Sequence, residues 1–111
     1  MEINVKEGVV TVVEITGSID GITAGAALTA LGDEVRKGNA RLVTDFTGVE
    51  YISSAGLRAL LATLKDARQQ GGDLRLAAIR PDVKKVLELS GFMSILKSYP
   101  DVAAAVASFG T

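Results

Sequence analysis

Two apolar periodicities alternate along this chain, and their alternation limits the folds that it can adopt. Stretches in which alternate or nearly all residues are apolar are typical of strands, whereas apolar residues three and four positions apart are typical of helices. The expected strands cover residues 3–5, 9–15, 41–46 and 74–79, and the expected helices cover about 24–37, 54–70, 81–89 and 101–109. The expected order is therefore β-β-α-β-α-β-α-α.

This order predicts an α/β fold, organised as one domain that spans residues 1–111. Right-handed crossovers place the first two helices on one side of a small sheet. Only Lys6-Glu7-Gly8 separates the first two strands, so they are close enough to pair as a hairpin. We therefore expect a small mixed β-sheet with helices mainly on one face.

The composition excludes several classes of function. The chain contains no Cys and no His, so it lacks a thiol nucleophile, Cys-ligated zinc and the usual general base near neutral pH. Twelve basic and thirteen acidic residues give a net charge of −1, which leaves no excess of cations to neutralise nucleic-acid phosphates. Neither common phosphate-cradling loop, G-x-x-x-x-G-K-[ST] or G-x-G-x-x-G, is present. We expect no catalytic residue, no cofactor, no metal site and no nucleic-acid partner.

No segment has the pattern of an export signal or a membrane span. Residues 1–7 lack a basic region followed by an apolar one. No apolar run approaches the roughly 18 residues that a transmembrane helix needs. We therefore expect a cytoplasmic protein without membrane insertion.

One segment combines a strand end, a turn and two adjacent hydroxyls at the start of a helix. It reads DFTGVEYISSAGLR and covers residues 45–58. The first N–H groups of a helix lack partners, and a Ser at this point can cap them, which stabilises by about 0.5–2 kcal/mol relative to Ala. The same N–H groups attract anions, so a phosphate on one of these hydroxyls would also be well placed. The pattern alone leaves both interpretations open.

The chain at these residues resembles the anti-sigma factor antagonist (anti-anti-sigma) family of bacterial STAS-domain proteins. The resemblance covers essentially the whole chain and is carried by Gly17-Ser18-Ile19-Asp20, by Asp45-Phe46-Thr47-Gly48-Val49 and by the segment from Tyr51 to Leu57. The first of these resembles the family's G-x-[LI]-D element, the second its central strand and turn, and the third its phosphorylation-site motif.

The resemblance implies a non-catalytic regulator that works by exchanging partners. Such a protein binds an anti-sigma factor that is also a serine kinase, and so releases the sigma factor to RNA polymerase. The kinase phosphorylates the antagonist on one Ser at the helix start, which ends the binding, and a serine phosphatase reverses the modification. Aligning Gly56-Leu57 with the family's Gly-Leu pair places the phosphoacceptor at Ser54. Family members often have Asp at the preceding position, where this chain has Ser53, so Ser53 is the second choice.

The resemblance also implies which residues contact the partner. Asp20 falls where the family has an acidic residue near the kinase-facing surface, although a turn residue after a strand would have the same pattern. Arg58 lies one turn into the helix and is explained equally well by a solvated helix face. The expected partner-binding residues are Asp20, Ser53, Ser54, Ala55, Gly56 and Arg58.

Two other functions remain open. STAS domains also resemble accessory subunits of lipid-transport ABC systems and parts of stress-signalling scaffolds, in which no phosphate cycle need occur. A nucleotide-binding protein or a small hydrolase is suggested only by the polar ends of the strands.

Overall fold

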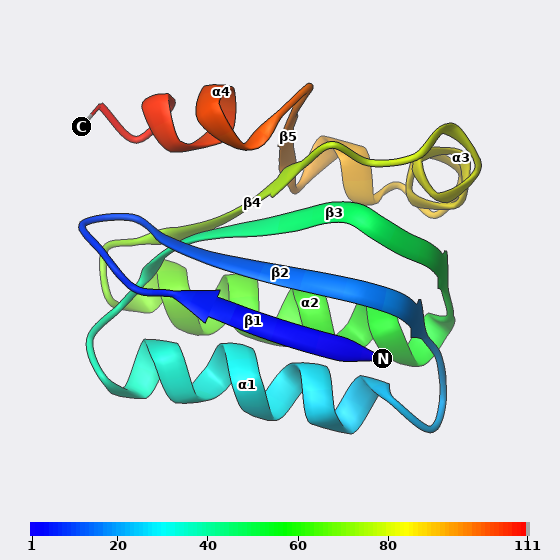
Figure 1. Cartoon of the computed structure of the whole chain (residues 1–111), viewed down its shortest axis with the longest axis horizontal. Coiled ribbons are helices and arrows are strands. Elements are labelled where there is room, and N and C mark those ends of the chain that lie inside the picture. The colour runs from blue at the N-terminus through cyan, green and yellow to red at the C-terminus, as the bar shows by residue number, and fades with distance from the viewer. Residues whose placement is uncertain (111) are drawn as a thin grey trace.

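The strands form one mixed sheet in the order β1-β2-β3-β4-β5 (Figure 1). The structure is a computed structural model that describes residues 1–110. The first two strands are antiparallel, and every other neighbouring pair is parallel. The strands are β1 (Glu2–Lys6), β2 (Thr11–Ile19), β3 (Arg41–Ile52), β4 (Asp73–Ala77) and β5 (Lys97–Tyr99). The helices are α1 (Ala24–Arg36), α2 (Ser54–Gln69), α3 (Pro81–Leu89) and α4 (Val102–Ala107), with a 3₁₀ turn at Phe92–Ser94.

The expected fold class is confirmed, and the expected strands and helices occur in the expected order, with one further short strand between the last two helices. Helices α1 and α2 cover one face of the sheet, and the apolar side chains of α3 join the same core. Helix α4 covers the opposite face, where Ala105 packs with Val43 and Ala77 of the sheet. The main core is built from alternate residues of the strands and from the apolar stripes of the helices, including Val13, Ile15, Leu42, Phe46, Leu74, Leu76, Leu31, Val35, Leu60 and Leu64.

Strand β3 is longer than the sequence pattern indicates. The turn expected at Thr47-Gly48 does not end the strand, because these residues form a bulge within it. The pairing with β2 shifts between Glu14↔Asp45 and Thr16↔Gly48, and the Asp45 carboxylate accepts hydrogen bonds from the backbone N–H and the hydroxyl of Thr47, at 3.0 and 2.6 Å. The turn-forming residues therefore bend the strand locally, and it continues alongside β2 to Ile52.

Strand β5 was not among the expected strands. It has only three residues, Lys97-Ser98-Tyr99, and these show no apolar alternation that would predict a strand. It forms because Leu96 is buried in the main core and holds the following residues against β4, with Leu76 opposite Ser98.

The parallel strands place the starts of two helices at one edge of the sheet. Strand β2 leads into α1 and strand β3 leads into α2, at the right of Figure 1. In open α/β sheets, this edge at the carboxyl ends of the strands is where binding sites are usually found. Among residues 1–110, no helix has both the length and the apolar character needed to cross a bilayer.

Candidate functional site

The start of α2 is pressed against the end of β2. The backbone N–H of Ser53 donates to the carbonyl oxygen of Ile19 at 2.8 Å. A Cβ atom on Gly56 would lie 2.8 Å from that same carbonyl oxygen and 2.7 Å from Cγ1 of Ile52. Contacts this short do not occur for real Cβ atoms, so only glycine lets the helix approach the strand so closely. The close approach fixes the position of both serines.

The two serines have different environments. Ser53 is the N-cap residue, with extended backbone, and its hydroxyl oxygen accepts a hydrogen bond from the N–H of Gly56 at 3.3 Å. Ser54 is the first residue of the helix, and its side chain is exposed. The first turn of α2 contains no acidic side chain. The capping role therefore belongs to Ser53, and the Ser54 hydroxyl lies at the positive end of a helix that no carboxylate in its first turn neutralises.

Asp20 holds the start of α1. One oxygen of its carboxylate accepts hydrogen bonds from the backbone N–H groups of Ile22 and Thr23, at 2.9 and 3.0 Å. These bonds, above all the one from Thr23, lower the pKa of Asp20. Thr23 is the N-cap residue of α1 by position, but its hydroxyl donates to the carbonyl of Ser18 and does not cap the helix. The Asp20 carboxylate thus fixes the turn immediately before α1 and is not a cap of the helix itself.

The structure brings most of the expected site residues to one corner of the molecule. Asp20 follows Ile19, whose carbonyl is bonded to Ser53. Ala55 is half-buried and packs against the main core, and Gly56 is buried beneath the corner. Arg58 is exposed on the surface of α2. The exposed chemical groups at this corner are therefore the Ser54 hydroxyl and the Arg58 guanidinium, beside the half-buried Asp20 turn.

An apolar groove beside Ser54 is a feature that the sequence pattern did not predict. It has a volume of about 400 Å³ and is lined by Tyr51, Ile52, Ser53, Ser54, Leu57, Val86, Leu89 and Ser90. Tyr51 is 52% exposed and Leu89 is 81% exposed, so together with Val86 they form an exposed apolar patch, which is more informative than a single exposed apolar residue. The groove thus joins the start of α2 to the surface of α3.

One signal in the sequence pointed to this groove. Val86 of α3 is 38% exposed, whereas Val83 and Leu87 of the same helix are buried. Val86 and Leu89 are three positions apart, so they share a second face of the helix. A helix with two apolar faces indicates that one of them is available to a partner.

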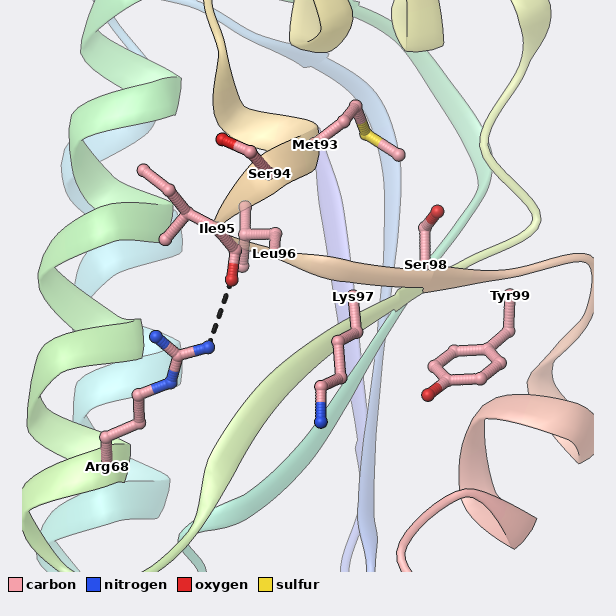
Figure 2. A pocket seen from close by; sticks show the side chains of 8 residues that line it. All are labelled: Arg68, Met93, Ser94, Ile95, Leu96, Lys97, Ser98 and Tyr99. Atoms are coloured by element: carbon pink, nitrogen blue, oxygen red, sulfur yellow. Dashed lines mark hydrogen bonds between the residues drawn. The ribbon is translucent and has the colours of Figure 1, made fainter.

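A larger hollow lies along β5, the edge strand at the opposite end of the sheet from β1. It measures about 690 Å³ and is lined by Arg68, Met93, Ser94, Ile95, Leu96, Lys97, Ser98 and Tyr99. Figure 2 shows Arg68 reaching from α2 to donate to the carbonyl of Ile95, at 3.0 Å. The lining contains no carboxylate and none of the expected site residues. This hollow therefore offers no pair of acids for hydrolysis.

Comparisons of the sequence and of the structure with known proteins find the same kind of relative. The model of the STAS domain family matches residues 1–105. A relative named putative anti-sigma factor antagonist BtrV, from Bordetella bronchiseptica, is 39% identical over 97 residues, which is 87% of this chain and 84% of the relative.

Two solved structures show the same fold. An anti-sigma factor antagonist from Mycobacterium paratuberculosis has a TM-score of 0.87 at 30% identity, covering 96% of this chain and 92% of that one. The Bacillus cell fate determinant SpoIIAA in its phosphorylated form has a TM-score of 0.71 at 15% identity, covering 93% of this chain and 96% of that one.

Proposed function

The chain belongs to the STAS domain family, and from this premise we propose that it is an anti-sigma factor antagonist switched by phosphorylation of Ser54. In this proposal it has no catalytic activity of its own and binds an anti-sigma factor that is also a serine kinase. Phosphorylation by that kinase ends the binding, and a serine phosphatase restores it. Residues 1–111 act as one STAS domain in the cytoplasm, where sigma factors meet RNA polymerase. The similarity to BtrV over most of both chains supports this role.

One observation carries the proposal: the exposed Ser54 hydroxyl lies between a helix N-terminus and an apolar groove. A partner that covers Tyr51, Val86 and Leu89 removes their apolar surface from water, which favours binding. The same partner must also cover Ser54. A neutral hydroxyl tolerates that burial if it finds a hydrogen bond, whereas a phosphate with about −1.5 to −2 charges does not.

The environments of the two serines favour Ser54 over Ser53 as the phosphoacceptor. The Ser53 hydroxyl is half-buried and already bonded to the N–H of Gly56. A kinase would have to break that cap in order to reach it. Ser54 is exposed, and a phosphate there gains the favourable potential of the helix N-terminus without any change of backbone.

The first experiment is an intact-mass measurement of the protein isolated from its own growing cells, with fragmentation to locate any modification. We expect a fraction of molecules to carry one phosphate, at Ser54. A phosphate at Ser53 would contradict the assignment of the acceptor but keep the switch. The complete absence of phosphate across several growth conditions would contradict the switch itself.

The second experiment compares what tagged variants capture from those cells. The wild type and Ser54→Ala should both retain a protein with a serine-kinase domain, while Ser54→Asp should retain at least about tenfold less, because the new charge lies under the partner. Leu89→Ser tests the groove and should also weaken capture, whereas Val9→Ser changes an equally exposed apolar residue outside the groove and should not. Capture of a transporter ATPase that ignores changes at Ser54 would overturn the proposal in favour of a constitutive subunit.

A further inference from the structure

Strand β1 is an edge of the sheet with one side unpaired. Within residues 1–110 it pairs only with β2, with Glu2 opposite Thr16 and Lys6 opposite Val12. Four of its five residues are exposed. Figure 1 shows it as the outermost strand, on the side of the sheet away from β5. The row of free backbone N–H and C=O groups along such an edge is a template for another strand.

The sequence of β1, Glu2-Ile3-Asn4-Val5-Lys6, is complementary to itself. When two copies run antiparallel with Asn4 opposite Asn4, each Glu2 faces a Lys6 of the other copy. In the same register each Ile3 faces a Val5, so that apolar residues meet on one side of the pair and opposite charges on the other. Cross-strand pairs of both kinds are favourable, by roughly 0.2–1 kcal/mol each.

Other ways of pairing two β1 strands lose this match. A parallel arrangement in register places Glu2 against Glu2 and Lys6 against Lys6, and like charges directly opposite are destabilising. An antiparallel arrangement displaced by two residues leaves one end of each strand without a partner. The charges of β1 therefore select one register and one orientation.

We propose that β1 is a self-association edge, at which a second copy of this chain adds its own β1 in antiparallel orientation. The product is a two-fold symmetric dimer with a sheet that continues from one copy into the other. Lys6 already contacts Glu14 of its own chain at 2.8 Å, so in the dimer it lies between that carboxylate and Glu2 of the second copy. Val5, which is 39% exposed in the single chain, becomes covered.

The dimer would leave the groove beside Ser54 open. Strand β2 lies between β1 and β3 in the sheet, and the groove is formed by the end of β3 together with α2 and α3. Each dimer therefore carries two separate Ser54 sites. A partner that is itself a dimer could bind both sites at once, and its overall affinity would rise through avidity.

Sedimentation of the full chain tests the proposal, at concentrations from about 10 µM to about 1 mM, since a contact of this size belongs to the weak class. We expect the wild type to form dimers as the concentration rises. Glu2→Lys alone and Lys6→Glu alone should each be monomeric over this range, because each places like charges opposite one another. An equimolar mixture of these two variants should form dimers again, because each contact then joins opposite charges.

Controls separate edge pairing from loss of structure. Thermal unfolding verifies that each variant is folded, which matters for Lys6→Glu because that change also faces Glu14. Lys97→Glu alters the other edge strand and should leave the dimer unchanged. A wild type that stays monomeric at about 1 mM, a mixture of variants that does not dimerise, or a dimer lost in Lys97→Glu would each overturn the proposal.

Discussion

Helices α1 and α2 begin side by side at the same edge of the sheet, yet their first turns are held differently. The Asp20 carboxylate binds the N–H groups of Ile22 and Thr23, in the turn just before α1, whereas the first turn of α2 itself is capped by the neutral hydroxyl of Ser53. A permanent negative charge therefore lies in the turn before the first helix, whereas the second helix starts without one. The two helix starts thus differ in charge, with a carboxylate in the turn before α1 and no negative charge in the first turn of α2.

The largest expected effect concerns the glycines of the two first turns. Gly56→Ala should destabilise the protein by about 1–3 kcal/mol, because the new Cβ has no room against Ile19 and Ile52. Gly25→Ala is the matched control in α1, where a Cβ meets nothing within 4 Å, and it should stabilise by about 0.5–1 kcal/mol. Urea denaturation measures both changes. Equal effects of the two substitutions would show that the starts of α1 and α2 do not differ in packing.

The next effect separates the capping residue Ser53 from the proposed phosphoacceptor Ser54. Ser53→Ala should cost about 1 kcal/mol of unfolding free energy, since it removes the hydrogen bond to the N–H of Gly56. Ser54→Ala should change it by less than about 0.5 kcal/mol, because the side chain is exposed. Ser53→Asp is a further control and should be nearly neutral, since Asp caps helices as well as Ser does. Denaturant melts in which Ser54→Ala costs more than Ser53→Ala would reverse the assignment.

The smallest effect is a pH dependence of stability, which should arise at the start of α1 and not at the start of α2. The backbone bonds from Thr23 and Ile22 lower the pKa of Asp20 below its value in the unfolded chain. Its contribution to stability is therefore present above about pH 4, the unfolded value, and is lost as the pH falls through the folded pKa. Asp20→Asn keeps an oxygen acceptor but does not titrate. The melting temperature of the wild type should exceed that of Asp20→Asn at pH 7, and the gap should narrow at about pH 3.

A gap that is the same at both pH values would contradict this account of Asp20. Ser53→Ala provides the comparison at the start of α2, because this substitution removes no titrating group. Its melting temperature should lie below that of the wild type by the same amount at both pH values.

Much of the fold could be predicted because local patterns and global packing agree. The apolar residues of the second predicted helix, such as Leu57, Leu60 and Leu64, are buried in the core as their spacing indicates. The paired serines at its start are also where the pattern placed them. Features that depend on residues close in sequence could therefore be predicted from the sequence alone.

The features that could not be predicted depend on contacts between distant residues. Strand β5 exists because Leu96 is anchored in the core and β4 offers a free edge. The groove needs the end of β3 and one face of α3 to meet across more than thirty positions of sequence. The turn before α1 depends on how the chain leaves β2 after Ile19, where the Asp20 carboxylate binds the N–H groups of Ile22 and Thr23.

The tight contact at Gly56 has a consequence for the speed of signalling. Lids and mobile loops limit many regulatory events because they rearrange on microsecond to millisecond time scales. The start of α2 has no free volume against Ile19 in which to adopt a second arrangement. In the proposed switch, a phosphate at Ser54 would therefore add charge without waiting for a backbone rearrangement, and the response time would be set by phosphoryl transfer and by dissociation of the partner.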